Sequence, residues 1–345
     1  MIRLGLCCQF LDSPIQFRTA THRYVATLGP EARRAYLADI AGHNAGALAG
    51  AVERCHELGI GAFRMTSQIL PLATHPESGY RLDQLDPSGG IAGAYEWAGA
   101  LARAYDVRLS LHPDQFVVLN SEREPVVKSA VQELELQADV AELTGADVIV
   151  LHAGGAGGGI PAGVERLERG LGLLTPRARE RLALENDDRC FTPLSLGRLC
   201  ERTGVPLVYD AHHHRCLPDG LSVAEASELA FGTWREREPH ISSPRDGWQS
   251  PNPRAHADYI DPADFPAFWR DRAITVDVEA KAKERAVLAI KVVLLKGSQI
   301  QASAFQAPVV QADDAGGIRL GGCEAEAPVQ AGGQDPFAAA ERERV

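Results

Sequence analysis

Residues 147–155 read DVIVLHAGG, a short apolar run that ends in His152 and is followed by glycine. Residues 107–113, VRLSLHP, have the same form, and His112 closes the apolar run. Short runs rich in valine, isoleucine and leucine predict buried strands, and the glycine or proline that follows predicts a turn. The chain repeats this arrangement, an apolar run that ends in His, Asp or Glu, along most of its length.

Strand-like and helical patterns alternate through the first 296 residues. Residues 35–58, 126–143 and 193–203 have helical patterns that each stop at a glycine, and Ser222 is a candidate N-cap for a helix through Phe231. Eight such strand–helix units predict an α/β fold, a TIM (β/α)8 barrel. A doubly wound sheet is the alternative, but it would place the strand ends in a row. The predicted strands cover residues 2–7, 61–65, 107–111, 147–151, 182–184, 206–209, 239–242 and 274–278.

The composition is that of a soluble globular protein, with 45% hydrophobic and 23% charged residues among 345. No apolar run reaches the roughly 18 residues of a membrane helix, and the N-terminus lacks the features of a signal peptide. The seven cysteines include no CxxC pair. This predicts reduced thiols in a cytoplasmic protein, and neither a cysteine-based zinc site nor a cysteine nucleophile.

Residues 297–345 have a different composition, rich in Ala, Gly, Gln and Pro and with little periodicity. We expect a disordered tail after a barrel domain of residues 1–296. The net charge of −11 at first argues against nucleic acid as a partner. However, the tail carries seven acids and three arginines, and bound metal would neutralise any ligating carboxylates. A DNA-binding face would then depend on local Lys and Arg together with the metals, and nothing in the sequence requires more than a monomer.

The side chains that close the apolar runs are of the types that bind divalent transition metals. In a TIM barrel, the carboxyl ends of the strands meet at one face, and active sites lie there. The sequence therefore predicts a multinuclear metal site at this face. The expected ligands are His112, His152, Glu185, Asp210, His213, His240, His256 and Glu279.

Each of these residues also has an ordinary structural interpretation. His112 or His152 alone could be a core histidine with a satisfied hydrogen bond, and it is their matching placement in consecutive strands that favours ligands. Glu185 and Glu279 end buried strands, where a carboxylate needs a partner or a cation. Glu185 is the expected bridge between ions.

The run DAHHH at residues 210–214 leaves the choice of histidine open. A D-x-x-H pair at a strand end can place both side chains on one metal, so the spacing favours His213 over His212 and His214. The latter two are expected next to the ligands or exposed to solvent.

Eight motifs, in order along residues 2–295, resemble those of the ultraviolet damage endonuclease family. Each motif alone is weak, but their joint occurrence is specific, and the tail lies outside the resemblance. The motifs are LATHP (72–76), SLHPDQF (110–116), LHAGGAGG (151–158), ALENDD (183–188), DAHHH (210–214), HISSP (240–244), HADYI (256–260) and EAKAKE (279–284).

The resemblance implies an ATP-independent DNA repair endonuclease on a TIM barrel. Its substrate would be damaged double-stranded DNA that contains cyclobutane pyrimidine dimers, 6-4 photoproducts or abasic sites, cut on the 5′ side of the lesion to leave a 3′-hydroxyl. It also implies a cluster of up to three divalent ions, typically Mn2+ and sometimes Mg2+ or Zn2+, on the eight residues above. Phosphodiester hydrolysis needs an activated water, charge neutralisation and help for the leaving oxygen, which such a cluster can supply.

The resemblance also implies roles for residues outside the ligand set. Gln115 and Phe116, which follow the strand-3 histidine, would probe the lesion, since an inserted aromatic and amide can replace flipped-out nucleotides in the base stack. The alternative for Phe116 is a loop side chain packed on the barrel rim. His75 is expected close to a phosphate, or else in a core or loop role. The expected catalytic residues are His75, Glu185, Glu279 and Lys281.

Two positions depart from the family pattern. Glu238 stands where the family commonly has a lysine, two residues before the strand-7 histidine, so we expect a variant metal site here. Leu6 stands where some members have an aromatic residue at the end of strand 1. Three alternatives stay open: an apurinic endonuclease of the endonuclease IV type, a metal-dependent sugar isomerase, and a non-catalytic DNA- or metal-binding barrel.

Overall fold

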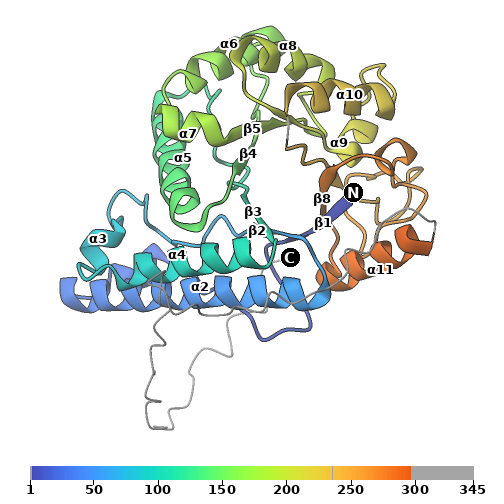
Figure 1. The fold of residues 1–345 in the computed structure, drawn as a ribbon. Coiled ribbons are helices and arrows are strands. Elements are labelled where there is room, and N and C mark those ends of the chain that lie inside the picture. Colours follow the sequence, from blue (N-terminus) through green and yellow to red (C-terminus); the bar gives the residue numbers. More distant parts are fainter. Residues whose placement is uncertain (1, 235, 297–345) are drawn as a thin grey trace, which may run out of the picture. The chain divides into compact units, whose positions relative to one another are not determined.

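Eight parallel strands, linked by helices, form the centre of the fold (Figure 1). The computed structural model describes residues 2–234 and 236–296. Each strand falls on a predicted run, although β6 and β7 are only two residues long. The strands are β1 (Ile2–Cys7), β2 (Ala62–Met65), β3 (Arg108–Leu111), β4 (Val148–His152), β5 (Leu182–Glu185), β6 (Leu207–Val208), β7 (His240–Ile241) and β8 (Ile274–Val278).

The strand order makes the sheet a nearly closed barrel. It runs β6-β5-β4-β3-β2-β1-β8-β7, so the last part of the chain pairs with the first. The two ends of this order meet at a single bridge between Asp210 and His240, where the His240 amide donates to the Tyr209 carbonyl at 2.9 Å. The TIM barrel predicted from the alternation of strands and helices is therefore confirmed, and the doubly wound alternative is wrong.

Three helices end, as predicted, at a glycine with a positive φ, a conformation that glycine adopts without strain. They are α2 (Pro30–Leu58) before Gly59, α5 (Glu124–Thr144) before Gly145 and α8 (Pro193–Thr203) before Gly204. α2 begins five residues earlier than predicted because proline is favoured in the first turn of a helix. Ser222 caps α10 (Val223–Thr233), as expected.

The remaining helical elements vary in length, and the longer helices lie outside the strands (Figure 1). None of the helices within the described ranges is long and apolar enough to cross a membrane. These elements are α1 (His22–Val25), α3 (Leu82–Leu85), α4 (Gly90–Ala104), α6 (Ile160–Leu171), α7 (Pro176–Arg181), α9 (Ala211–Cys216), α11 (Lys283–Lys296) and a 3-10 turn at Ala267–Trp269.

The main apolar core lies between the strands and the helices, where Leu48 of α2, Phe63 of β2 and Leu134 of α5 are fully buried. Successive side chains of a strand point to opposite faces. The strand residues on either side of a core residue such as Phe63 therefore point into the barrel. The interior has an apolar part, formed by Val148, Val150, Ala183 and Val208. It also has buried polar residues, Arg64, Ser110, Glu238 and Asp277.

Asp277 depends on the glycine opposite it. Gly5 of β1 pairs with Asp277 of β8, and a Cβ atom at residue 5 would overlap the Asp277 carboxylate. Glu238 and Asp277 each lie two residues before a predicted ligand, so strand alternation puts them on the same side of the strand as that ligand. The predicted tail, residues 297–345, lies outside the described residues, and the division at residue 296 stays a prediction.

Candidate metal centre at the carboxyl ends of the strands

Glu185 lies at the centre of the strand ends, with four histidines around its carboxylate. Its Oε2 is 2.8 Å from Nε2 of His112 and 3.6 Å from Nδ1 of His152. Its Oε1 is 3.1 Å from Nδ1 of His240 and 3.3 Å from Nδ1 of His213. The pairing of β4 with β5 sets His152 and Glu185 side by side. One buried carboxylate therefore connects side chains from β4, β7, α9 and the residue that follows β3.

The charges in this group depend on one another. Burial alone would raise the pKa of Glu185, but the surrounding histidines, His152 and His240 foremost, hold it well below its usual range. Burial alone would lower the pKa of His240, but the Glu185 and Glu279 carboxylates raise it to about 9. The pKa of His213 is raised as well, by Asp210 and Glu185 against the effect of burial. Protons on His240 and His213 thus balance the carboxylates, and divalent cations can take the place of those protons.

Asp210 and His213 form a second part of the group, where β6 leads into α9. Asp210 is the N-cap of α9, and its Oδ1 accepts a hydrogen bond from the His213 amide at 2.6 Å. The same spacing leaves Oδ2 of Asp210 3.6 Å from Nδ1 of His213. The Asn186 side chain bonds both the amide and the carbonyl of Asp210, at 2.9 and 3.0 Å. The D-x-x-H spacing thus combines helix capping with convergence of two side chains.

Glu279 forms a third part, just after β8. Its Oε1 lies 3.5 Å from Nδ1 of His240 and 2.6 Å from Nη1 of Arg64, and its Oε2 lies 3.8 Å from Nδ1 of His256. Burial would raise the pKa of Glu279, but Arg64 and then the histidines hold it well below its usual range. With Glu279 and His256, all eight residues predicted as ligands are brought into one group.

The donor atoms of this group suit divalent cations. Nδ1 of His152 and Oδ2 of Asp210 are buried without a hydrogen-bond partner, which costs free energy unless a cation or water contacts them. Imidazole and carboxylate together are ligands for Mn2+ and Zn2+. Three sets of donors have ligand atoms within 4.8 Å of one another: His112, Glu185 and His240; Glu185, Asp210 and His213; and Asp210, His240 and Glu279.

Besides Arg64, two further charged residues that the motifs did not single out lie beside this group. Oδ2 of Asp277 is 3.9 Å from Nε2 of His240. Arg108 of β3 places Nη1 2.6 Å from Oε2 of Glu238. The spacing to Glu279 could have revealed Asp277, because residues two apart in a strand share a face. No comparable signal pointed to Arg108, whose partner Glu238 lies just before β7, a strand that is not paired with β3.

Glu238, the possible metal-site variant, is 2% exposed. Burial raises the pKa of Glu238 to about 7 although Arg108 opposes the shift. One carboxylate oxygen of Glu238, one of Asp277 and a ring nitrogen of His240 lie within 4.8 Å of one another. Glu238 therefore lies next to the centre, on the inside of the barrel beside His240.

Gln115 and Phe116 lie in the loop after β3, on the same end of the barrel. Both are exposed, and 78% of the Phe116 surface is accessible. The Phe116 amide donates to Oδ1 of Asp114 at 3.0 Å, and the Val117 amide donates to the Asp114 carbonyl at 2.8 Å, so the loop is a defined turn. The Phe116 ring is directed to solvent and is not packed on the barrel rim.

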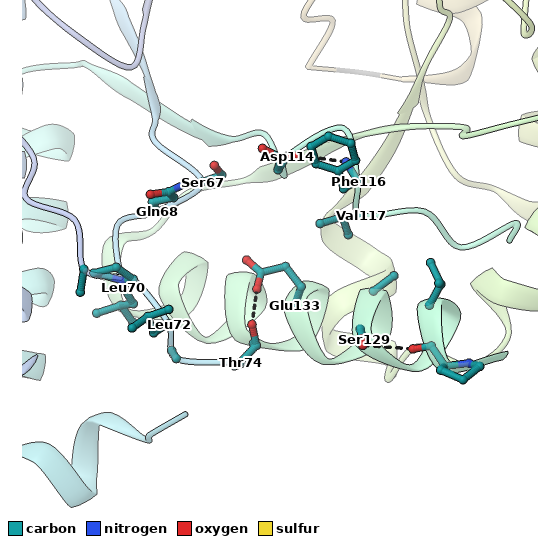
Figure 2. A pocket seen from close by; sticks show the side chains of 16 residues that line it. Ser67, Gln68, Leu70, Leu72, Thr74, Asp114, Phe116, Val117, Ser129 and Glu133 are labelled. Carbon is teal, nitrogen blue, oxygen red and sulfur yellow. Dashed lines mark hydrogen bonds between the residues drawn. The ribbon is translucent and has the colours of Figure 1, made fainter. Parts of the chain in front are cut away.

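A cleft of about 590 Å³ opens beside this loop, and Figure 2 shows Phe116 at its edge. Leu70 and Leu72 line it from the segment after β2, and Glu133 of α5 lines the other wall. The Thr74 hydroxyl donates to Oε2 of Glu133 at 2.8 Å across the cleft. None of the eight predicted ligands lines this cleft, so it is a feature separate from the metal centre.

His75 is held in the segment after β2. Its Nδ1 accepts hydrogen bonds from the amides of Glu77 and Ser78 at 3.1 and 3.2 Å, so Nδ1 carries no proton and Nε2 is the protonated nitrogen. The ring stacks on His22 with a centroid distance of 4.2 Å. His75 can therefore donate one hydrogen bond through Nε2.

Lys281 and the remaining histidines lie around the centre. The Lys281 side chain is exposed, and its amide donates to the Ala257 carbonyl at 3.1 Å. His212 and His214 are both buried, which rules out exposure to solvent and leaves the other expectation, a place next to the ligands. His214 bonds the Tyr209 hydroxyl at 2.9 Å, whereas the His212 ring lies 5.0 Å from that of His256. Of the three adjacent histidines, only His213 faces Glu185.

Leu6 lies within β1 and is fully buried, so it cannot stand in for an exposed aromatic residue at the strand end. The six cysteines within the described residues are all free, in keeping with the predicted reduced thiols.

The fold and the clustered side chains define a class of protein: a TIM barrel that gathers histidines and carboxylates, able to bind metal, at the carboxyl ends of its strands. The model of the family described as UV-endonuclease UvdE matches residues 2–306. The chain therefore belongs to this family of DNA-cleaving enzymes, as the motifs predicted.

Individual relatives agree with this assignment. The UV DNA damage endonuclease of Deinococcus radiodurans is 36% identical over 303 residues, which cover 84% of this chain and 94% of that protein. The crystal structure of SacUVDE has a TM-score of 0.75 and 28% identity, and covers 86% of this chain and 99% of its own. The structure of endonuclease IV from Thermus thermophilus has a TM-score of 0.55 and 19% identity, and covers 86% of this chain and 100% of its own. This likeness shows a shared fold alone.

Proposed function

We propose that this chain is a metal-dependent endonuclease that cuts the DNA backbone on the 5′ side of ultraviolet photoproducts. The observation that carries the proposal is the convergence of histidines on Glu185 at the barrel face that also exposes Phe116. Pyrimidine dimers and 6-4 photoproducts are the proposed lesions, and abasic sites are a further candidate. A cytoplasmic location is part of the proposal, since the substrate would be chromosomal DNA.

The proposed cofactor is a cluster of up to three divalent ions, Mn2+ before Mg2+ or Zn2+. The eight strand-end residues would hold it, and Glu185 would be shared between ions because each of its oxygens faces two histidines. Bound cations would supply an activated water, neutralise charge at phosphorus and stabilise the leaving oxygen. Arg64 would keep Glu279 in place through their 2.6 Å contact.

The other residues would position the DNA. His75, whose Nδ1 already accepts two amide hydrogen bonds, would donate from Nε2 to a phosphate oxygen, so we assign it as a donor rather than a general base. Lys281 is exposed and would attract the phosphate backbone. Gln115 and Phe116 would enter the base stack at a lesion, where damaged bases unstack at low cost.

The experiment that tests this function uses supercoiled plasmid. Irradiated plasmid should be relaxed by the protein with Mn2+, undamaged plasmid should not, and EDTA should abolish the cutting. A third sample with abasic sites separates the lesion classes: cutting of abasic plasmid alone would instead support activity of the endonuclease IV type. Absence of any nicking with Mn2+, Mg2+ or Zn2+ would contradict the proposal.

A further inference from the structure

His240 joins two groups of acidic side chains through its two ring nitrogens. Nδ1 faces the metal centre, 3.1 Å from Glu185 and 3.5 Å from Glu279. Nε2 faces the barrel interior, where Oδ2 of Asp277 is 3.9 Å away and Glu238 is close by. The exposed fractions of Glu238, His240 and Asp277 are 2%, 0% and 0%. This second group is therefore sealed from bulk solvent.

The polar atoms of this buried group lack hydrogen-bond partners. Both carboxylate oxygens of Glu238, both of Asp277 and Nε2 of His240 are buried without one. Five such atoms in one place are unusual, because buried polar atoms in folded proteins nearly always have a partner. The group is thus arranged for a donor that can satisfy the carboxylates, and Nε2 of His240 is the donor that points at them.

Two arginines indicate whether the buried group at Nε2 of His240 would hold a further cation or would instead orient the His240 ring. Nη1 of Arg108 lies 2.6 Å from Oε2 of Glu238, although not aligned as a hydrogen bond, and Nη1 of Arg64 lies 3.8 Å from Oδ2 of Asp277. A divalent ion between these carboxylates would be repelled by both guanidinium groups. An N–H group adds no such charge, so the geometry favours an orienting role.

We propose that Glu238 and Asp277 are positioning residues that receive the Nε2–H of His240 and so present its Nδ1 to the metal centre. This inference rests on the proposed metal-dependent function. Carboxylates that accept the second N–H of a ligating histidine fix both its tautomer and its ring orientation. A small rotation of the Asp277 carboxylate or one bridging water closes the 3.9 Å gap. Arg108 holds Glu238 in the place where it can share this role.

Asp147 provides a matched control. It pairs with the same Arg108, at 2.9 Å from Nε, but its side chain is 40% exposed and it is not part of the group at His240. Glu238→Gln and Asp147→Asn each remove one negative charge from Arg108. Only Glu238→Gln removes a carboxylate beside His240. Asp277→Asn is the second test variant, because it leaves the pair of Arg108 and Glu238 intact.

The experiment measures Mn2+ binding by isothermal titration calorimetry and counts bound ions by mass spectrometry on the full chain. Glu238→Gln and Asp277→Asn should each lower Mn2+ affinity about tenfold or more with the number of ions unchanged, whereas Asp147→Asn should stay within about twofold of the wild type. Loss of an ion in Glu238→Gln would make Glu238 a ligand and overturn the inference. Equal losses in Glu238→Gln and Asp147→Asn would overturn it too, because the effect would act through Arg108.

A spectroscopic readout separates positioning from general destabilisation. The sample is protein loaded with Zn2+ and labelled with 15N-histidine. The signals of the His240 ring are assigned by their loss in His240→Gln, and they should show a protonated Nε2. Its Nε2 resonance should shift in Glu238→Gln or Asp277→Asn, but not in Asp147→Asn. A protonated Nδ1 would overturn the inference. Wild-type protein that binds no Mn2+ or Zn2+ would refute the proposed function itself, whereas normal binding in both variants would refute only the positioning role.

Discussion

Glu185 and His240 are 55 residues apart in the sequence, yet Oε1 of Glu185 lies 3.1 Å from Nδ1 of His240. The other oxygen of the same carboxylate lies 2.8 Å from Nε2 of His112. Strands β3, β5 and β7 are therefore connected at their carboxyl ends by one buried side chain. The balance of charge around that side chain determines what the centre can bind, and the predictions below change it one group at a time.

Glu185→Gln keeps the size of the side chain but removes its charge. We expect the variant to lose at least one bound Mn2+ and to cut irradiated plasmid at least about a hundredfold more slowly, in the range seen when one charge-stabilising group is removed from an active site. Ion counts and plasmid relaxation measure the two effects. Glu180→Gln, at an exposed position just before β5, is the control and should match the wild type. Unchanged metal content in Glu185→Gln would rule out its bridging role.

The histidines give metal binding a pH dependence. The pKa of His240 is raised to about 9, and that of His213 is also raised, by Asp210 and Glu185 against the effect of burial. Mn2+ must displace these protons, so its apparent affinity should increase from pH 6.5 to pH 9. Titrations at pH 7 in buffers of different ionisation enthalpy should report proton release. Affinity that falls over this interval would contradict the assignment of these histidines as ligands.

The same pKa shifts predict how the stability of the chelator-treated protein changes with pH. A histidine with a raised folded-state pKa contributes stability that is complete below its unfolded pKa of about 6.5 and is lost as pH rises toward about 9. Glu238, whose pKa is raised to about 7, changes stability in the same direction between about 4.5 and 7. The melting temperature should therefore fall from pH 6.5 to 9.5, and less so in His240→Gln. A rise over this range would show that other groups dominate.

Phe116→Ala tests the lesion-probing role separately from folding. Because the ring is 78% exposed, the free energy of unfolding should change by less than about 0.5 kcal/mol. Cutting of irradiated plasmid should fall about tenfold, since loss of one base–aromatic stack costs about 1–3 kcal/mol, and Phe116→Tyr should restore it. Trp97→Ala, at another exposed aromatic residue, is the control. Full activity in Phe116→Ala would show that the ring does not enter the DNA.

Gly5→Ala should destabilise the barrel. The added Cβ would overlap the buried carboxylate of Asp277, and extra volume in a packed interior costs about 1–3 kcal/mol. Urea denaturation measures the change. Gly42→Ala and Gly46→Ala in α2, where a Cβ meets nothing within 4 Å, should be neutral or stabilising because alanine favours a helix. A stable Gly5→Ala would mean that Asp277 can move away at little cost.

Much of the fold and most of the site could be predicted because they rest on local patterns. Apolar runs that end in His112, His152 or Glu185 define both a strand and the residue at its end, and the eight ends converge only if the sheet closes. The lengths of the shortest strands were harder to predict. β6 and β7 are only two residues long, and the barrel closes between them through the Asp210–His240 bridge. Such a contact between distant segments leaves no trace in either segment alone.

The interior network could not be predicted for the same reason. Arg108 pairs with Glu238 across 130 positions of sequence, and neither residue lies in a recognisable motif with the other. The sequence also left open whether His212 is buried or exposed, because three consecutive histidines carry no periodic signal. In contrast, His213 followed from its spacing to Asp210, which a helix cap explains.

The central claim is that this metal centre cuts DNA beside ultraviolet lesions. The most direct measurement uses a duplex oligonucleotide with a single cyclobutane thymine dimer, labelled on the damaged strand, and chelator-treated protein to which Mn2+ is returned. We predict one cut on the 5′ side of the dimer, with a 3′-hydroxyl that a polymerase can extend, and no cut in the undamaged duplex or without metal. Equal cutting of damaged and undamaged duplexes, or cutting that persists in EDTA, would contradict the account.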